Sequence, residues 1–129
     1  MSNPQSQNQN LNLKSNVRYR SYHFSLSIIR FVQNLPEKRI YWSIGDQLLR
    51  SSTSIGANLV EAQSLSSKKD FMRYYEIALK SGNETRYWLS LIKDSNLIDN
   101  KELIYLLDEA NQIANMIGSS LLTMKHKKI

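Results

Sequence analysis

The chain has 129 residues, enough for one domain built around a single hydrophobic core. It contains no cysteine, which excludes disulfides, thiolate metal sites and cysteine nucleophiles. Only four glycines and two prolines interrupt it, which favours long helices over a β-rich fold. The formal net charge of +6 is unevenly placed: residues 1–23 and 125–129 each contribute +3, while residues 24–124 hold 11 basic and 11 acidic side chains.

Residues 1–16 form a polar leader rich in Asn, Gln and Ser. This composition provides too little apolar surface to order a segment, so we predict a disordered tail. The leader lacks the apolar run of a signal peptide, and no stretch approaches the roughly 20 apolar residues that span a bilayer. We therefore predict a soluble, cytoplasmic protein without membrane association, in which residues 17–124 form the domain and residues 125–129 a basic tail.

Apolar side chains recur at helical spacing in the first half of the domain. A first helix is expected over about residues 17–35, where Pro36 stops it. A second is expected over about residues 38–63. We keep it unbroken across residues 51–54, whose helix propensity is weak, because the apolar stripe continues in phase on both sides. The predicted core residues of these helices are Phe24, Ile28, Phe31, Leu35, Ile40, Ile44, Leu48, Ile55, Leu59 and Ala62.

Two further helices are predicted in the second half. Ser67 and Asp70 have capping-box spacing at the start of a third helix that runs to about Asp94, and Asp99 and Glu102 repeat this spacing before a fourth. Their predicted core residues are Phe71, Tyr75, Ala78, Gly82, Leu89, Ile92, Leu103, Leu107, Ala110, Ala114, Ile117, Leu121 and Met124. Four helices joined by short turns alternate in direction, so the sequence predicts an all-α, antiparallel up-down-up-down four-helix bundle.

The sequence shows no recognisable catalytic or metal-binding constellation. His23 and His126 lie near opposite ends of the domain, and neither has a second ligand three or four residues away. The Glu-x-x-His pairs of di-iron bundles, glycine-rich phosphate loops and the nucleophile elbow are also absent. We therefore predict a protein that is not an enzyme, has no cofactor or metal, and has no identified small-molecule substrate.

A polar stripe runs along the second predicted helix. Its members recur at spacings of three or four and fall within about 80° of one another around the helix: Gln47, Arg50, Ser54, Asn58 and Glu61. Ser and Asn are unusual on a solvated face, which normally favours Lys and Glu. Two interpretations remain open. The stripe is either a solvent face with helix-stabilising charge pairs, or a semi-buried network between helices or subunits in which Arg50 pairs with Glu61, joined by Asn58 or Glu84.

Small and aromatic residues suggest close helix contacts and an interface. Mid-helix positions in the second and third helices are small: Ser54, Gly56, Ala57, Ala78, Ser81 and Gly82. Aromatic residues occur in three adjacent pairs: Tyr41–Trp42, Tyr74–Tyr75 and Tyr87–Trp88. Neighbours on a helix point about 100° apart, so one member of each pair can enter the core while the other points outward. Outward Tyr and Trp are typical anchors of protein interfaces.

Three segments carry a family resemblance: QLLRSSTSIGANLVEAQ (47–63), KKDF (68–71) and ALKSGNETRYWL (78–89). The chain resembles, over about residues 24–122, the four-helix-bundle proteins first known from intervening sequences in bacterial 23S rRNA genes. The resemblance implies a ring-like homopentamer of antiparallel bundles. A related branch, the accessory protein of diversity-generating retroelements, is a basic pentamer that binds nucleic acid and a reverse transcriptase. The family's implied signature positions are Arg50, Ser54, Ile55, Asn58, Glu61 and Glu84.

Two functions remain as hypotheses. The leading one is a non-enzymatic, oligomeric scaffold or assembly protein, with a homopentamer favoured. The alternative is an accessory factor that binds RNA or DNA without regard to sequence, through electrostatic contacts with phosphates. Its expected contacts are the basic residues near the two ends of the chain: Arg18, Arg20, Lys125, Lys127 and Lys128.

Overall fold

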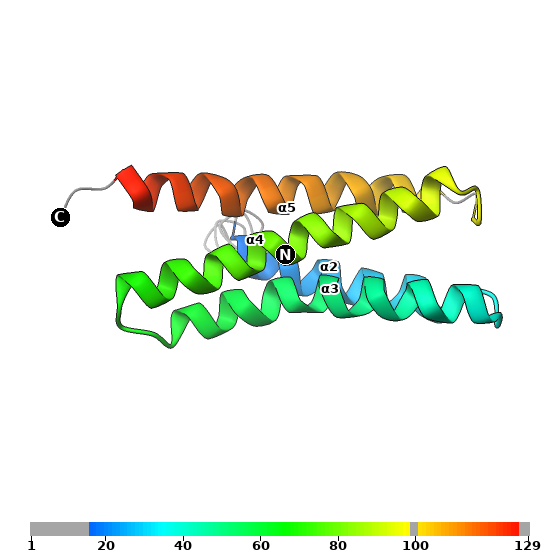
Figure 1. The fold of residues 1–129 in the computed structure, drawn as a ribbon, viewed down its shortest axis with the longest axis horizontal. Coiled ribbons are helices and arrows are strands. Elements are labelled where there is room, and N and C mark those ends of the chain that lie inside the picture. Colours follow the sequence, from blue (N-terminus) through cyan, green and yellow to red (C-terminus); the bar gives the residue numbers. More distant parts are fainter. Residues whose placement is uncertain (1–15, 99–100, 127–129) are drawn as a thin grey trace, which may run out of the picture.

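The computed structural model describes residues 16–98 and 101–126 of the chain. They form four α-helices: α2 (Val17–Gln33), α3 (Arg39–Gln63), α4 (Lys68–Asp94) and α5 (Lys101–His126). Successive helices run in opposite directions (Figure 1). Each helix packs against the next, and α2 closes the arrangement against α5, whereas helices on the diagonals do not meet within the described residues. The predicted all-α, antiparallel four-helix bundle is confirmed.

The helix ends follow local sequence signals. The Asn16 side chain accepts a hydrogen bond from the Arg18 N–H at 2.8 Å and caps the start of α2. The Ser67 hydroxyl oxygen accepts one from the Asp70 N–H at 3.3 Å, as predicted for the start of α4. Helix α5 continues to His126, two residues beyond the predicted end of the domain at residue 124. The leader over residues 1–15, the predicted cap at Asp99 and residues 127–129 lie outside the described residues.

The core contains most of the predicted residues. The largest fully buried apolar side chains are Phe24, Ile28, Leu48, Ile55, Leu59, Leu89, Ile92, Leu103, Leu106, Ile113 and Ile117. Leu106 and Ile113 were not in the predicted stripe, because a core-facing helix buries more than two positions per heptad. The prediction for Ile40 is wrong: it is 49 % exposed, since it lies in the first turn of α3 at the end of the bundle.

Helix α3 is unbroken across residues 51–54, as predicted. The hydroxyls in this stretch bond to carbonyl oxygens of the preceding turn. Ser51 donates to the Leu48 carbonyl at 3.2 Å, and Thr53 donates to the Leu49 carbonyl at 2.8 Å. These bonds satisfy side chains that would otherwise compete with the helix.

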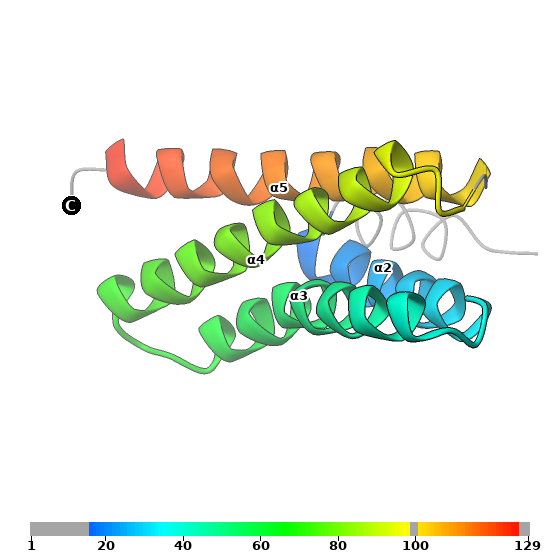
Figure 2. The ribbon, with the colours of Figure 1, turned by 45° about the vertical axis from the view of Figure 1, so that its right-hand side comes forward.

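Helix α2 is much shorter than its partners. Its 17 residues correspond to about 26 Å, against roughly 38–40 Å for the 25 to 27 residues of the others. It begins partway along α5, so α3, α4 and α5 extend beyond it at one end (Figures 1 and 2). No helix in the described part of the chain is long and apolar enough to cross a membrane.

Candidate functional site

A layer of small polar side chains joins α3 to α4. The Thr85 side chain on α4 is completely buried, and its hydroxyl lies 3.0 Å from the Ser51 hydroxyl on α3. It also donates to the Ser81 carbonyl at 2.8 Å. One turn along, the Ser54 and Ser81 hydroxyls are 3.0 Å apart. Because these bonds need specific partners across the interface, they fix the register of α3 along α4.

Asn58 extends this hydroxyl layer along α3. Its side-chain amide donates to the Ser54 carbonyl at 2.7 Å and contacts the Ser54 hydroxyl at 3.0 Å. Two of the predicted network residues are therefore in a semi-buried network. Ser51 and Thr85 also belong to this network and were not predicted from the sequence. The available signal was Ser51 itself, a polar residue between Leu48 and Ile55 on the apolar stripe.

The other members of the predicted network do not join it within one chain. Arg50 and Glu61 are exposed, and their side chains have no partner among the described residues. Eleven residues apart on one helix, they are separated by about 16 Å, too far to pair. The prediction of a semi-buried Arg50–Glu61 pair is therefore wrong within a chain. Glu84 is exposed and accepts a hydrogen bond from Trp88 at 3.3 Å, and Gln47 is half-buried without a hydrogen bond among the described residues.

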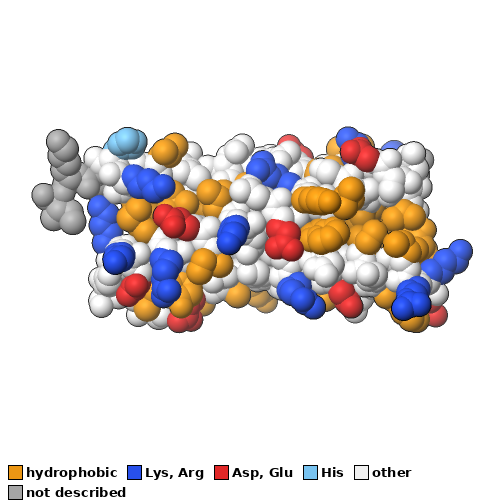
Figure 3. Space-filling model, viewed as in Figure 1, with side chains coloured by type: hydrophobic (Ala, Val, Ile, Leu, Met, Phe, Trp, Pro, Cys, Tyr) orange, Lys and Arg blue, Asp and Glu red, His pale blue; other side chains and the backbone are white. Residues whose placement is uncertain are grey.

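The side of α3 that faces away from the bundle forms one continuous stripe. Its members, here called the α3 outer face, are Trp42, Asp46, Arg50, Thr53, Ala57 and Val60. Trp42 is 60 % exposed and Val60 64 % exposed, and only two of the six carry a charge. Figure 3 shows apolar side chains gathered where α4 ends and α3 begins, and charged ones more frequent towards the opposite end. The exposed Tyr87 and Leu91 belong to this half of α4.

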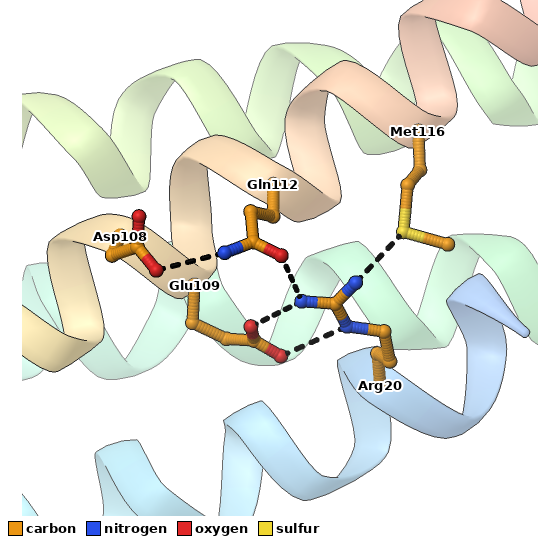
Figure 4. Close-up of polar contacts among 5 residues, drawn as sticks. All are labelled: Arg20, Asp108, Glu109, Gln112 and Met116. Atoms are coloured by element: carbon orange, nitrogen blue, oxygen red, sulfur yellow. Dashed lines mark hydrogen bonds and ion pairs between the residues drawn. The ribbon is translucent and has the colours of Figure 1, made fainter. Parts of the chain in front are cut away.

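Arg20 links α2 to α5 (Figure 4). Its Nε donates to Glu109 Oε2 at 3.1 Å, and its Nη2 pairs with the other Glu109 oxygen and donates to Gln112 Oε1 at 2.7 Å. The hydrogen bond to Glu109 raises the pKa of Arg20 above its ordinary value, with burial opposing. Within the chain, the Arg20 guanidinium already pairs with a carboxylate, so its contact with nucleic acid stays a prediction that this arrangement does not favour.

Other basic residues lie towards both ends of the bundle, and the group at one end includes two of the predicted contacts. Arg18 and Lys125 are exposed at the start of α2 and the end of α5. Helix α4 begins at the end of the bundle where α5 finishes, and it contributes Lys68, Lys69 and Arg73. Figure 3 shows several basic side chains at this end. Lys127 and Lys128 lie outside the described residues.

The titratable residues of the described part of the chain do not assemble into a metal site. No group of three or more His, Asp and Glu side chains there could hold an ion. His23 contacts the rings of Tyr19 and Tyr22, with centroids 4.4 and 5.5 Å away, and His126 is exposed at the end of α5.

These features define the class of the protein: an all-α four-helix bundle with a buried hydroxyl layer and signature charges on its outer surface. A family model described as 23S rRNA-intervening sequence protein matches residues 14–119. The chain belongs to the 23S rRNA-intervening sequence protein family.

A solved structure supports the same assignment. It is a 1.70 Å crystal structure of a protein of unknown function from the S23 ribosomal protein family of Bacteroides thetaiotaomicron. The two sequences are 32 % identical, with a TM-score of 0.77, and the match covers 82 % of this chain and 98 % of that one. A search of curated proteins finds no significant match. Neither the family nor the solved structure indicates an enzyme class.

Proposed function

We propose that this protein is a non-enzymatic building block that assembles with copies of itself into a scaffold, with five copies favoured. The observation that carries the proposal is the α3 outer face. A solvated helix face is normally rich in Lys and Glu, but this face presents Trp42, Ala57 and Val60 with only two charges. Exposed aromatic and aliphatic side chains beside a few charges are the composition of a protein interface.

The exposed signature charges fit an interface between copies. In a closed ring, each contact joins two different patches, so a residue on one copy meets a different residue on the next. Arg50 has no partner among the described residues of its own chain. Glu61 on α3 and Glu84 on α4 are exposed carboxylates. We infer that Arg50 of one copy pairs with Glu61 or Glu84 of the next. The family resemblance favours a ring of five.

Charge reversal tests this assembly. Arg50→Glu places like charges at the interface and should shift the population to monomers. Combining it with Glu61→Arg or Glu84→Arg should restore the oligomer for whichever carboxylate is the partner. Lys101→Glu, an exposed charge reversal on α5, which does not contact α3, is the matched control and should leave assembly unchanged. Sizing of all variants at one concentration distinguishes the outcomes. If Arg50→Glu still assembled fully, Arg50 would not lie at the interface.

A second candidate function is sequence-independent binding of RNA or DNA. The observation that favours it is the group of basic residues at the end of the bundle where Lys127 and Lys128 follow α5 in the sequence: Arg18, Lys68, Lys69, Arg73 and Lys125. A second basic group, which includes Lys93 and Lys101, lies at the opposite end. In an oligomer the first group would be repeated on every copy, so weak contacts with phosphates would add through avidity.

Salt-dependent binding tests this second function. Lys69→Gln with Lys125→Gln should weaken binding of labelled RNA and DNA. The slope of log affinity against log salt should become shallower by roughly 0.7–0.9 for each phosphate that the variant no longer neutralises. Lys93→Gln with Lys101→Gln removes the same charge at the opposite end and is the control. Equal weakening in both double variants would argue against a site at the basic end.

A further inference from the structure

Two adjoining hollows occupy the end of the bundle beyond the start of α2. The first, about 580 Å³, lies between the start of α2, the end of α3, and α4 and α5; Arg18, Gln63, Asn115 and Ser119 are among its lining residues. The second, about 400 Å³, lies between α4 and α5 and is lined in part by Phe71 and Met124. Tyr75, Ser119 and Ser120 line both, so the hollows meet. Each is within the size range of small-molecule sites, about 300–1,000 Å³.

Tyr75 stands between the hollows with an unused hydrogen-bonding group. Its side chain is 7 % exposed, and its ring stacks on Phe71 with centroids 4.7 Å apart. The hydroxyl has no hydrogen-bond partner among the described residues, although it borders both hollows. The Tyr75 oxygen is not a buried unpartnered atom, so it opens onto the hollows and is available to a bound molecule.

The two hollows differ in chemistry. Arg18 gives the first hollow a positive charge. This charge is close enough to Tyr75 to favour the ionised form of its phenol. The amino end of α2 also faces this hollow through Asn16 and Val17, which adds positive potential. Among the described residues, no carboxylate lines either hollow. The second hollow offers the Phe71 ring and the Met124 thioether, an apolar surface beside a cationic one.

We propose that the joined hollows bind one small amphipathic anion. Arg18 and the Tyr75 hydroxyl hold its phosphate or carboxylate group, with amide and hydroxyl donors from Asn115 and Ser119, and its apolar part lies between Phe71 and Met124. The arrangement provides donors and one cation at one end and an aromatic surface at the other, which is the pattern of a specific ligand site. The site belongs to a single chain and does not depend on the proposed assembly.

Calorimetric titration of the full chain with 1-naphthyl phosphate tests the proposal, at moderate salt and with backbone amide NMR shifts to locate the site. We expect binding that is tighter than for inorganic phosphate or 1-naphthol, with shifts near Arg18, Tyr75 and Ser119. Arg18→Gln should weaken it about tenfold or more, the effect of losing one charge-assisted hydrogen bond, and Tyr75→Phe should also weaken it. Arg30→Gln removes an exposed charge at the other end of α2 and should have no effect.

Parallel titration with 1-naphthoate decides whether the site prefers phosphate or carboxylate. Circular dichroism melting confirms that the variants remain folded. No binding of either probe at millimolar concentration overturns the proposal. The same holds if Arg18→Gln and Tyr75→Phe bind as the parent does, or if the shifts map to other surfaces. Contacts from Leu11 or Leu13 to Tyr75 that the probe does not displace would show the leader filling the hollows, which also overturns it.

Discussion

Arg20 of α2 donates to both carboxylate oxygens of Glu109 of α5, a residue 89 positions further along the chain. The side chains are only 21 % and 15 % exposed, so solvent screens the pair less than an ordinary surface ion pair. Together with Gln112 and Met116, this contact links the shortest helix to the middle of α5. The register of α2 in the bundle therefore depends on a polar contact as well as on Phe24 and Ile28.

Removal of this contact should lower stability. Arg20→Ala should reduce the free energy of unfolding by about 1–3 kcal/mol, between the values for exposed and buried pairs. Arg30→Ala, on the exposed side of the same helix, should change it by no more than about 0.5 kcal/mol. Urea unfolding of Arg20→Ala, Glu109→Ala and the double variant measures the coupling. A coupling energy near zero would show that the two residues are close without stabilising the fold.

Two glycines should respond in opposite ways to larger side chains. A Cβ at Gly118 would meet nothing within 4 Å, so Gly118→Ala should stabilise α5 by about 0.5–1 kcal/mol through its helix propensity. At Gly82 a Cβ would already lie 3.7 Å from the Ala114 Cβ, so Gly82→Leu should destabilise by about 1–3 kcal/mol through overpacking. Thermal unfolding checks both, and equal effects at the two positions would contradict the described packing of α4 on α5.

Stability should fall in alkaline solution partly through Tyr75. Burial raises the pKa of the Tyr75 hydroxyl above its ordinary value of 10.0, with the charge of Arg18 opposing. The folded state therefore holds this proton more tightly than the unfolded state. The resulting stability is fully present below about pH 10 and is lost as the pH rises through the folded pKa. Tyr75→Phe should lose less stability than the parent between pH 7 and about pH 10.5. The exposed Tyr22→Phe is the control and should follow the parent.

Local patterns were sufficient to predict the helices. Apolar spacing, the stop at Pro36 and the cap at Ser67 place the four elements within a few residues, because each signal acts over a single turn. The hydroxyl layer was only partly predictable. Ser54 and Asn58 appeared in a polar stripe, whereas Thr85 became recognisable only once α4 was placed against α3.

Long-range pairing was not predictable from the residues alone. Arg20 lies in a basic region of the sequence and looked like a free cation, but its partner, Glu109, comes from the last helix. Conversely, Arg50 and Glu61 share a helical face and looked like a pair, but the rise of the helix keeps them apart within one chain. In both cases the spacing of residues gives direction around a helix and says little about contacts between helices.

In the proposed assembly, another copy of the chain covers the α3 outer face. Size-exclusion chromatography with light scattering on the full chain at micromolar concentration tests it most directly. A ring of five gives one species of about 75 kDa, five times the 15.0 kDa chain, and Arg50→Glu should shift it towards the monomer. A single species of 15.0 kDa for the parent across that concentration range would contradict it.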